Sequence, residues 1–254
     1  MRELAVLLGH HIGYSASPAV HNAAFAALGL DARYELADVA PERLAEAVDA
    51  LRGPGRIGAN VTQPHKLAVR DLVDGVSPEV ERLGAANTII RADERLLAHN
   101  TDLPALAAEL HALGHVTSAA VLGAGGASRA AQAALRDAGA VVHVVDRGRW
   151  DAIPDILAEC QLLVNATPIG TGSDESPVAA DLLRDDLAVL DLVYRPSPTR
   201  LVREARAAGA VARGGAGMLL RQAALSFALW TGRDAPVEVM RDALRRELGE
   251  GTDA

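Results

Sequence analysis

The sequence predicts an α/β protein of two domains, and three observations lead to that prediction. At 254 residues the chain is longer than most single domains. Apolar residues make up 50% of it and aromatic residues only 3%, so alanine, valine and leucine must form the core. Segments with strand-like and helix-like patterns alternate along the chain, which is typical of domains built on a parallel sheet.

The first part of the chain alternates between strands and helices up to a predicted hairpin. Ser17 and Pro18 begin a helix, with the serine as N-cap and the proline at the first helical position, and Gly29 ends it. After Pro78, two apolar strands flank the turn residues 92–94, which predicts a hairpin. The other expected elements are strands over 4–8, 33–39 and 56–61 and a helix over 41–51.

A second domain is predicted to begin with a helix that starts at Asp102 and ends before Gly114. From Ser118 the pattern becomes strand, glycine-rich loop, helix and strand. We therefore place residues 1–101 in the first domain and residues 102–218 in the second. Further strands are expected over 162–166 and 188–192, and helices over 199–208, 218–230 and 236–247, before a frayed polar tail.

The composition excludes several classes of partner. A formal net charge of −8 argues against nucleic acid and anionic membranes, which require a basic surface. No apolar run approaches the ~20 residues of a membrane span, and the single cysteine, Cys160, cannot form an intramolecular disulfide. We therefore expect a soluble cytoplasmic protein with a small-molecule ligand, either a monomer or a homodimer. None of the histidines lies beside the cysteine, and no metal site is expected.

A glycine-rich loop over residues 123–127 lies between an apolar strand and a helix. Glycines there let the backbone turn tightly and approach a pyrophosphate, whose charge then lies at the helix N-terminus. The same pattern also occurs in ordinary strand-to-helix turns. A second strand that ends on the acidic Asp146 supplies the remaining condition for a dinucleotide site, which we predict here.

Polar side chains follow the strands of the first domain and begin its helices. A serine pair before the first helix could bind a carboxylate, although Ser17 is also explained as an N-cap. Lys66 and Asp102 could transfer protons, although a loop lysine is usually exposed and Asp102 could be a capping acid. Asn87 could satisfy a turn, and His65 could be a base or simply a solvated side chain. Together with the glycine loop, these groups indicate a dehydrogenase for a hydroxy acid.

Eight motifs, in this order, resemble the shikimate dehydrogenase family over the whole chain. In the first half they are S-x-S-P-x-x-H-N at 15–22, N-V-T-x-P-x-K at 60–66, G-A-x-N-T at 84–88 and N-T-D at 100–102. In the second half they are G-A-G-G-A-S-R-A at 123–130, N-A-T-P-x-G at 165–170, D-L-V-Y-x-P at 191–196 and G-x-x-M-L-x-x-Q at 215–222.

The resemblance implies reduction of 3-dehydroshikimate to shikimate, usually with NADPH, in aromatic amino-acid biosynthesis. Lys66 and Asp102 would be the catalytic pair, with the lysine transferring the proton at the reacting oxygen. Ser15 and Ser17 would bind the substrate carboxylate, and serine rather than threonine at position 17 favours shikimate over quinate. The other substrate contacts would be Thr62, Asn87, Tyr194 and Gln222. The cofactor would contact Gly123, Ala124, Gly125, Gly126, Ala127, Leu192 and Gly215.

The resemblance also implies a discontinuous first domain, onto which the C-terminal helices over 219–254 pack back. The second domain departs from the family pattern, because only residues 147–161 separate Asp146 from the next strand. That length accommodates one helix near 153–159 but not a helix, a strand and another helix. We therefore predict a Rossmann-like domain that lacks its third strand, on the adenine side, rather than a re-routed loop that keeps the strand elsewhere.

The cofactor preference depends on the residues that follow the second strand of this domain. Asp146 alone favours NAD, because a carboxylate accepts a hydrogen bond from the ribose 2′-hydroxyl and repels a 2′-phosphate. Arg147 lies at the family's phosphate-binding position and favours NADP, and Arg149 either assists it or faces solvent. We predict NADP, with NAD possible, and weakened cofactor affinity because of the short segment. The alternatives are a quinate/shikimate-type dehydrogenase that uses NAD, and a non-catalytic ligand-binding relative with a degraded nucleotide site.

Overall fold

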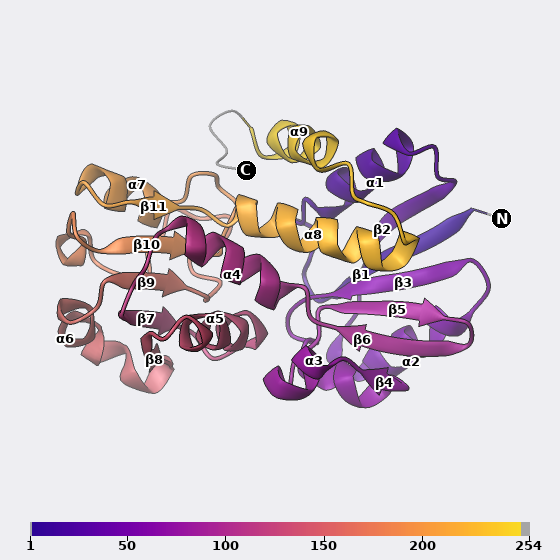
Figure 1. The fold of residues 1–254 in the computed structure, drawn as a ribbon, viewed down its shortest axis with the longest axis horizontal. Helices are drawn as coiled ribbons and strands as arrows, with labels where there is room; N and C mark the ends of the chain where they lie inside the picture. Colours follow the sequence, from indigo (N-terminus) through magenta and orange to yellow (C-terminus); the bar gives the residue numbers. More distant parts are fainter. Residues whose placement is uncertain (1, 250–254) are drawn as a thin grey trace. The chain divides into compact units, whose positions relative to one another are not determined.

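The computed structural model describes residues 2–249, so the last residues of the expected tail, 250–254, lie outside the described part. The chain divides into two compact units. The first runs up to Asp102 and resumes over Leu220–Glu247, and the second spans Leu103–Leu219. Each unit is an α/β layer structure around its own sheet (Figure 1).

The first unit is built on a mixed six-stranded sheet in the order β2-β1-β3-β5-β6-β4. β1 pairs in parallel with β2 and β3, whereas the predicted hairpin forms the antiparallel pair β5–β6, with Asp93 and Glu94 as its turn. The two-residue strand β4 was not predicted. The strands are β1 (Glu3–Gly9), β2 (Ala32–Asp38), β3 (Arg56–Val61), β4 (Gly75–Val76), β5 (Thr88–Ala92) and β6 (Arg95–His99).

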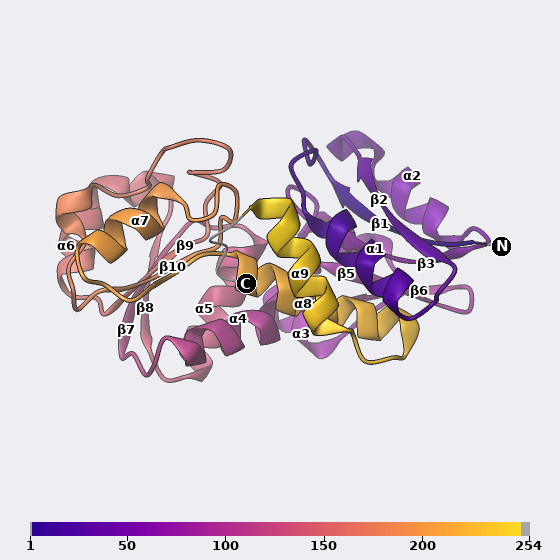
Figure 2. The same ribbon diagram turned by 90° about the horizontal axis from the view of Figure 1, so that it is seen from above.

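Helices cover both faces of this sheet. On one face lie α1 (Ser17–Ala27), α9 (Val237–Leu248) and the part of α8 (Ala216–Thr231) that belongs to this unit, as Figures 1 and 2 both show. The opposite face carries α2 (Leu44–Asp49) and α3 (Pro78–Leu83), the latter not predicted from the sequence. The continuous helix expected over 41–51 is wrong: α2 is a short α-helix between 3₁₀ turns at Pro41–Arg43 and Ala50–Arg52.

The long helix α8 is held on the first sheet by aromatic residues. Phe227 packs on Phe25 with ring centroids 5.3 Å apart, and the Trp230 indole donates to the Ile89 carbonyl at 2.9 Å. Gly58 makes this approach possible, because a Cβ there would lie 2.2 Å from the Ile89 oxygen and 2.5 Å from the Trp230 nitrogen. The segment over 220–247 is therefore an integral part of the first unit.

The second unit has an all-parallel five-stranded sheet in the order β11-β10-β9-β7-β8. Within the described residues β8 is an edge strand, so the predicted loss of the strand beyond it is confirmed. The segment between β8 and β9 forms a 3₁₀ helix (Arg147–Ala152) and α6 (Ile153–Ala158), as its length predicted. The strands are β7 (Ser118–Leu122), β8 (Val141–Val145), β9 (Leu162–Asn165), β10 (Ala188–Asp191) and the unpredicted β11 (Ala212–Arg213).

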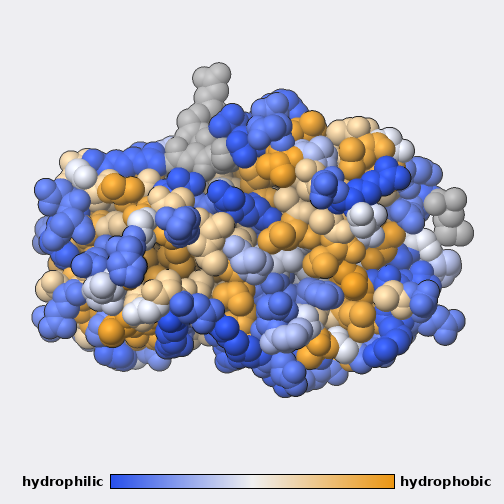
Figure 3. Space-filling model, viewed as in Figure 1, coloured by the Kyte–Doolittle hydropathy of each residue, from blue (hydrophilic) through white to orange (hydrophobic). Residues whose placement is uncertain are grey.

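The helices of the second unit also lie on both faces of its sheet. α4 (Asp102–Ala112) and α5 (Gly126–Asp137) lie on one face, and α6 and α7 (Arg200–Ala207) on the other (Figure 2). On the visible face of each unit, hydrophobic residues are interspersed with hydrophilic ones (Figure 3), as is normal for a protein surface. No helix in the described range 2–249 has the length and apolarity needed to cross a membrane.

Candidate active site

The central feature of the first unit is a hydrogen-bonded ion pair between Lys66 and Asp102. Lys66 lies in the loop after β3 and Asp102 is the first residue of α4, and Nζ lies 2.6 Å from Oδ2. The side chains are only 16% and 3% exposed. The lysine is therefore not the solvated loop residue that its sequence position alone would suggest, and the predicted pair is brought together by the fold.

The carboxylate of Asp102 is held at its second oxygen by Asn87. The Asn87 amide donates to Asp102 Oδ1 at 2.8 Å and to the Thr101 hydroxyl at 2.9 Å. Its carbonyl oxygen accepts from the Thr101 backbone N–H at 2.7 Å. Because both amide hydrogens are engaged within the protein, Asn87 acts here as the residue that orients Asp102.

A buried polar network supports this pair from inside the first unit. The Asn60 amide donates to Ser226 Oγ at 2.9 Å and to Thr88 Oγ1 at 3.1 Å, and its oxygen accepts from the Tyr34 hydroxyl at 2.9 Å. Ser226 Oγ also lies 3.2 Å from Thr101 Oγ1. Sequence reasoning missed Ser226, although it follows Gln222 by four residues and so lies on the same face of a helix.

Lys66 is also the single lysine of the sequence, since the other basic side chains among the 25 are all arginines. Sequence reasoning missed this signal. An arginine stays protonated under all physiological conditions, whereas a lysine can release its proton when its surroundings favour the neutral form. The one lysine of the sequence is thus the residue that is paired with the buried Asp102.

The hydroxyls of Ser15 and Ser17 lie next to each other, 3.2 Å apart. The prediction that Ser17 caps the first helix is wrong. The N-cap is Ala16 in a right-handed helical conformation, and no side chain caps α1. The helix begins at Ser17 itself, and Pro18 lies in its first turn. The Ser17 hydroxyl is therefore not used as a helix cap, and it accepts a hydrogen bond from the Ser15 hydroxyl.

Two other predicted substrate residues belong to the same unit as the ion pair. Thr62 directly follows β3, and its backbone N–H donates to the Leu8 carbonyl at 2.8 Å. Gln222 lies on α8 with 9% of its surface exposed, and its backbone carbonyl oxygen accepts from the Ser226 hydroxyl at 3.0 Å. Both residues are therefore held by contacts within the first unit.

Two histidines of the matched motifs are structural. His65 is 2% exposed and its Nε2 lies 2.7 Å from the Val39 carbonyl, so the expectation of a solvated side chain is wrong. His21 is completely buried and stacks on Tyr34 with ring centroids 4.4 Å apart. Burial lowers the pKa of His21 to about 3, so the ring is neutral at physiological pH.

The glycine loop of the second unit has the geometry that a dinucleotide needs. Gly123 has a φ of +106°, and a Cβ there would lie 2.9 Å from the Ala166 carbonyl oxygen, so only glycine fits. The Ser128 hydroxyl donates to the Gly123 carbonyl at 2.6 Å and closes the loop. At Gly125, the N-cap of α5, the space that a Cβ would fill is open. This turn and helix start could therefore hold a pyrophosphate.

The residues expected near the nicotinamide are also in the second unit. Gly215 packs directly on the backbone of Leu192, since a Cβ at position 215 would lie 2.3 Å from the Leu192 oxygen. Tyr194 follows two residues later in the same connection after β10 and is half-buried. The backbone of this segment is therefore fixed by close packing that only glycine allows.

Three charged residues after β8 were predicted to select the cofactor, and two of them already have hydrogen-bond partners within the protein. Asp146 Oδ1 accepts from the Gly148 backbone N–H at 3.0 Å, so the carboxylate caps its own turn. Arg149 donates to the Val144 carbonyl at 3.2 Å and is therefore partly committed to the backbone. Arg147 is exposed.

A second buried carboxylate lies in the second unit, in the matched D-L-V-Y-x-P motif. Asp191 accepts from the Thr199 hydroxyl at 2.6 Å, from the Asn165 amide at 2.9 Å and from the Val193 backbone N–H at 3.0 Å. Desolvation raises its pKa to about 6, although these hydrogen bonds oppose the rise. This aspartate connects the motifs at 165–170 and 191–196.

Comparisons with known proteins identify the family of this chain. Residues 7–89 match the model of the shikimate dehydrogenase substrate binding domain, and residues 215–245 match that of the shikimate 5′-dehydrogenase C-terminal domain. The shikimate dehydrogenase (NADP(+)) of Halorubrum lacusprofundi is 45% identical, with 95% of this chain and 98% of the relative covered.

Solved structures give the same result. A shikimate 5-dehydrogenase from Thermus thermophilus, in complex with NADP(H) and shikimate, superposes with a TM-score of 0.89 at 39% identity, covering 97% of this chain and 100% of that one. A quinate dehydrogenase from Corynebacterium glutamicum in complex with NAD has a TM-score of 0.86 at 29% identity, covering 96% and 99%. The chain therefore belongs to the shikimate dehydrogenase family.

Proposed function

We propose that this chain catalyses the reversible reduction of 3-dehydroshikimate to shikimate with NADPH. The observation that carries the proposal is the 2.6 Å pair between Lys66 and Asp102, with Asn87 bound to the second carboxylate oxygen. The order of the matched motifs and the ligands named for the Thermus relative support the choice of substrate and cofactor.

In the proposed mechanism, Lys66 donates a proton to the oxygen of the substrate ketone as that oxygen becomes an alcohol. When bound, NADPH would supply a hydride to the carbonyl carbon that carries this oxygen. Asp102 holds the ammonium group in position and stabilises its charge before the transfer. In the reverse direction the neutral amine of Lys66 accepts the hydroxyl proton.

Substrate recognition is assigned to the groups around this pair. Ser15 and Ser17 present adjacent hydroxyls that fit a carboxylate. Thr62 and Gln222 would bind ring hydroxyls, and Tyr194 would complete the site. Asn87 would also bind a ring hydroxyl, which would take the place of one of its present partners, Thr101 or Asp102. In this assignment, the part of the chain up to residue 101, with 219–254 as far as it is described, binds the substrate, and residues 102–218 bind the cofactor.

We infer a preference for NADP over NAD from the residues that follow β8. The side chains of Asp146 and Arg147 are both exposed, but one oxygen of the Asp146 carboxylate accepts a hydrogen bond from the Gly148 N–H, whereas Arg147 would be placed to bind a 2′-phosphate. The pyrophosphate would lie on the loop over Gly123, Ala124, Gly125, Gly126 and Ala127. Because no strand borders β8 on its outer side among the described residues, we expect weaker NADPH binding than in relatives that have one. A dissociation constant equal to theirs would contradict this.

The decisive experiment follows nicotinamide absorbance with shikimate or quinate as substrate and NADP⁺ or NAD⁺ as cofactor. We expect the highest kcat/KM for shikimate with NADP⁺. The acidic Asp146 and the NAD complex of the quinate dehydrogenase favour a second candidate, oxidation of quinate with NAD⁺. Absence of turnover with every pair, despite shikimate binding measured by calorimetry, would support a non-catalytic binding protein instead.

The proposal includes a cellular compartment and an oligomeric state. We propose a reducing compartment such as the cytoplasm, because the single cysteine, Cys160, is a buried free thiol and cannot form an intramolecular disulfide. The enzyme would act as a monomer or a homodimer, which sedimentation of the untagged protein distinguishes.

A further inference from the structure

We propose that His10, His11 and Asp38 form a binding site for a divalent transition-metal ion, separate from the proposed reaction. His10 and His11 directly follow β1, and Asp38 is the last residue of β2. β1 and β2 pair in parallel, with Gly9 opposite Asp38, so the sheet brings both histidines beside the carboxylate. One ligand atom from each residue lies within 4.8 Å of the other two.

The backbone at His11 is what places the two rings on the same side. Successive side chains of an extended chain point to opposite sides, yet the centroids of the two imidazole rings lie 3.8 Å apart. His11 has a φ of +57°, the left-handed region that non-glycine residues adopt rarely and that histidine tolerates better than most. Its backbone N–H donates to Asp38 Oδ1 at 3.1 Å, which holds this conformation. Such local strain is typical of functional positions.

The spacing of the ligand atoms suits a small cation. A zinc ion about 2.1 Å from each ligand atom separates neighbouring tetrahedral ligands by about 3.4 Å. His10 Nδ1 lies 3.0 Å from Asp38 Oδ1, close to that separation. The His11 ring is exposed and can rotate toward the same point. Water can complete the coordination, because the side chains of His10 and Asp38 are 33% and 52% exposed.

The chemistry of the ligands determines which ions fit. Two imidazole nitrogens and one carboxylate oxygen favour Zn²⁺, Co²⁺ or Ni²⁺, whereas Mg²⁺ and Ca²⁺ prefer oxygen ligands alone. Sequence reasoning overlooked the site because it considered histidine and cysteine spacing along the chain. The third ligand lies 27 residues beyond His11 and comes into reach only through the pairing of β1 with β2.

The test is a titration of chelator-treated protein that carries no histidine tag. By calorimetry we expect one Zn²⁺ to bind per chain, with a dissociation constant in the micromolar range. Bound Co²⁺ should show the visible absorption of a site with few ligands. Mg²⁺ should not compete. The variants His10→Ala, His11→Ala and Asp38→Asn should each weaken binding by about tenfold or more, since each removes one ligand. Circular dichroism shows whether each variant is folded.

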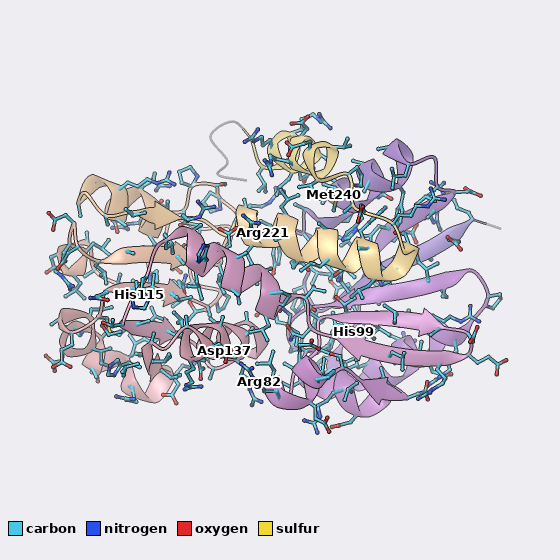
Figure 4. All side chains as sticks on the ribbon, in the orientation of Figure 1. Arg82, His99, His115, Asp137, Arg221 and Met240 are labelled. Carbon is cyan, nitrogen blue, oxygen red and sulfur yellow. The ribbon has the colours of Figure 1, made fainter. Side chains whose placement is uncertain are left out.

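A matched control is His115→Ala, which removes an exposed histidine of the second unit (Figure 4). His111 and His115 have a spacing that binds metal on a continuous helix, but α4 ends at Ala112 and Gly114 has a φ of +94°. This variant should bind Zn²⁺ as the wild type does. The proposal is overturned if the wild type shows no saturable binding. It is also overturned if folded His10, His11 and Asp38 variants bind normally, or if His115→Ala abolishes binding.

Discussion

Each unit of the molecule buries an aspartate that belongs to a matched motif, and the two carboxylates have different partners. Asp102 in the first unit is buried, and it binds the ammonium of Lys66 and the amide of Asn87. Asp191 in the second unit is 1% exposed, and it accepts from one hydroxyl, one side-chain amide and one backbone N–H. Asp102 is thus paired with a cation, whereas the donors around Asp191 are all neutral.

We interpret this difference as separating the proposed site of proton transfer from a structural connection. A carboxylate that orients an amine can support chemistry, because the amine has a proton to give and is still 16% exposed. A carboxylate surrounded by neutral donors instead stabilises the turns that supply those donors. Burial of an acid in a matched motif therefore does not by itself indicate a catalytic role.

The largest effect is expected at the lysine of the first pair. Lys66→Ala should lower kcat by about 10²–10⁴-fold, because the proton donor is lost. Lys66→Arg should stay equally impaired, since it keeps the charge but cannot release a proton. Because Lys66 is the only lysine, ¹³C-methylation followed by NMR reports its titration with just the N-terminal amine as a second signal. Near-normal turnover of either variant would remove the assigned role.

The second effect is a pH dependence of stability at Asp191. The folded-state pKa, raised to about 6, lies above the ordinary aspartate pKa of 3.8. Between these two values the folded protein therefore keeps a proton that the unfolded chain releases. The stability that this proton contributes is fully present below pH 3.8 and is lost as the pH rises through about 6. Relative to Asp191→Asn, the free energy of unfolding of the wild type should fall by up to about 3 kcal/mol across this range.

Urea denaturation between about pH 4 and pH 7 measures this difference. Asp151→Asn, at an exposed aspartate of the same unit, is the control and should show no comparable change. Asp191→Asn should keep most of its kcat once folded. If it instead lost activity as severely as Lys66→Ala, the distinction between the two carboxylates would fail.

A smaller effect is expected at the exposed arginine after β8. Arg147→Ala should raise the KM for NADPH by about tenfold, the loss of one solvent-exposed phosphate contact, and leave the KM for NADH almost unchanged. Arg149→Ala should change the KM for NADPH less, because that side chain donates to the Val144 carbonyl. An equal rise for both cofactors with Arg147→Ala would indicate a structural role.

The smallest effect is expected at the serine pair. Ser17→Thr adds one methyl group next to the Ser15 hydroxyl and should shift the ratio of kcat/KM for shikimate and quinate toward quinate by less than about tenfold. Steady-state kinetics with both substrates measures the ratio. An unchanged ratio would mean that position 17 does not select between them.

Local sequence patterns predicted much of the secondary structure of this molecule. The alternation of strands and helices, the glycine turn before α5, the β5–β6 hairpin and the short crossover over 147–161 are all readable from the sequence, because each depends on neighbouring residues. The boundaries of short elements were less predictable. The helix expected over 41–51 divides into three pieces, and Ala16 rather than Ser17 is the N-cap of α1. Tertiary packing decides the exact residues at which such short helices begin and end.

The partners of the polar side chains were decided by the tertiary structure. Sequence motifs identified Lys66, Asn87 and Asp102 separately, but strand pairing and the start of α4 bring them within hydrogen-bonding distance. The same holds for Asp38 beside His10, which depends on the register of β1 against β2. Residue type and spacing determine which chemistry a chain can carry. Long-range pairing and burial decide which of those groups meet, because contacts between distant residues form only when the sheet and its covering helices pack together.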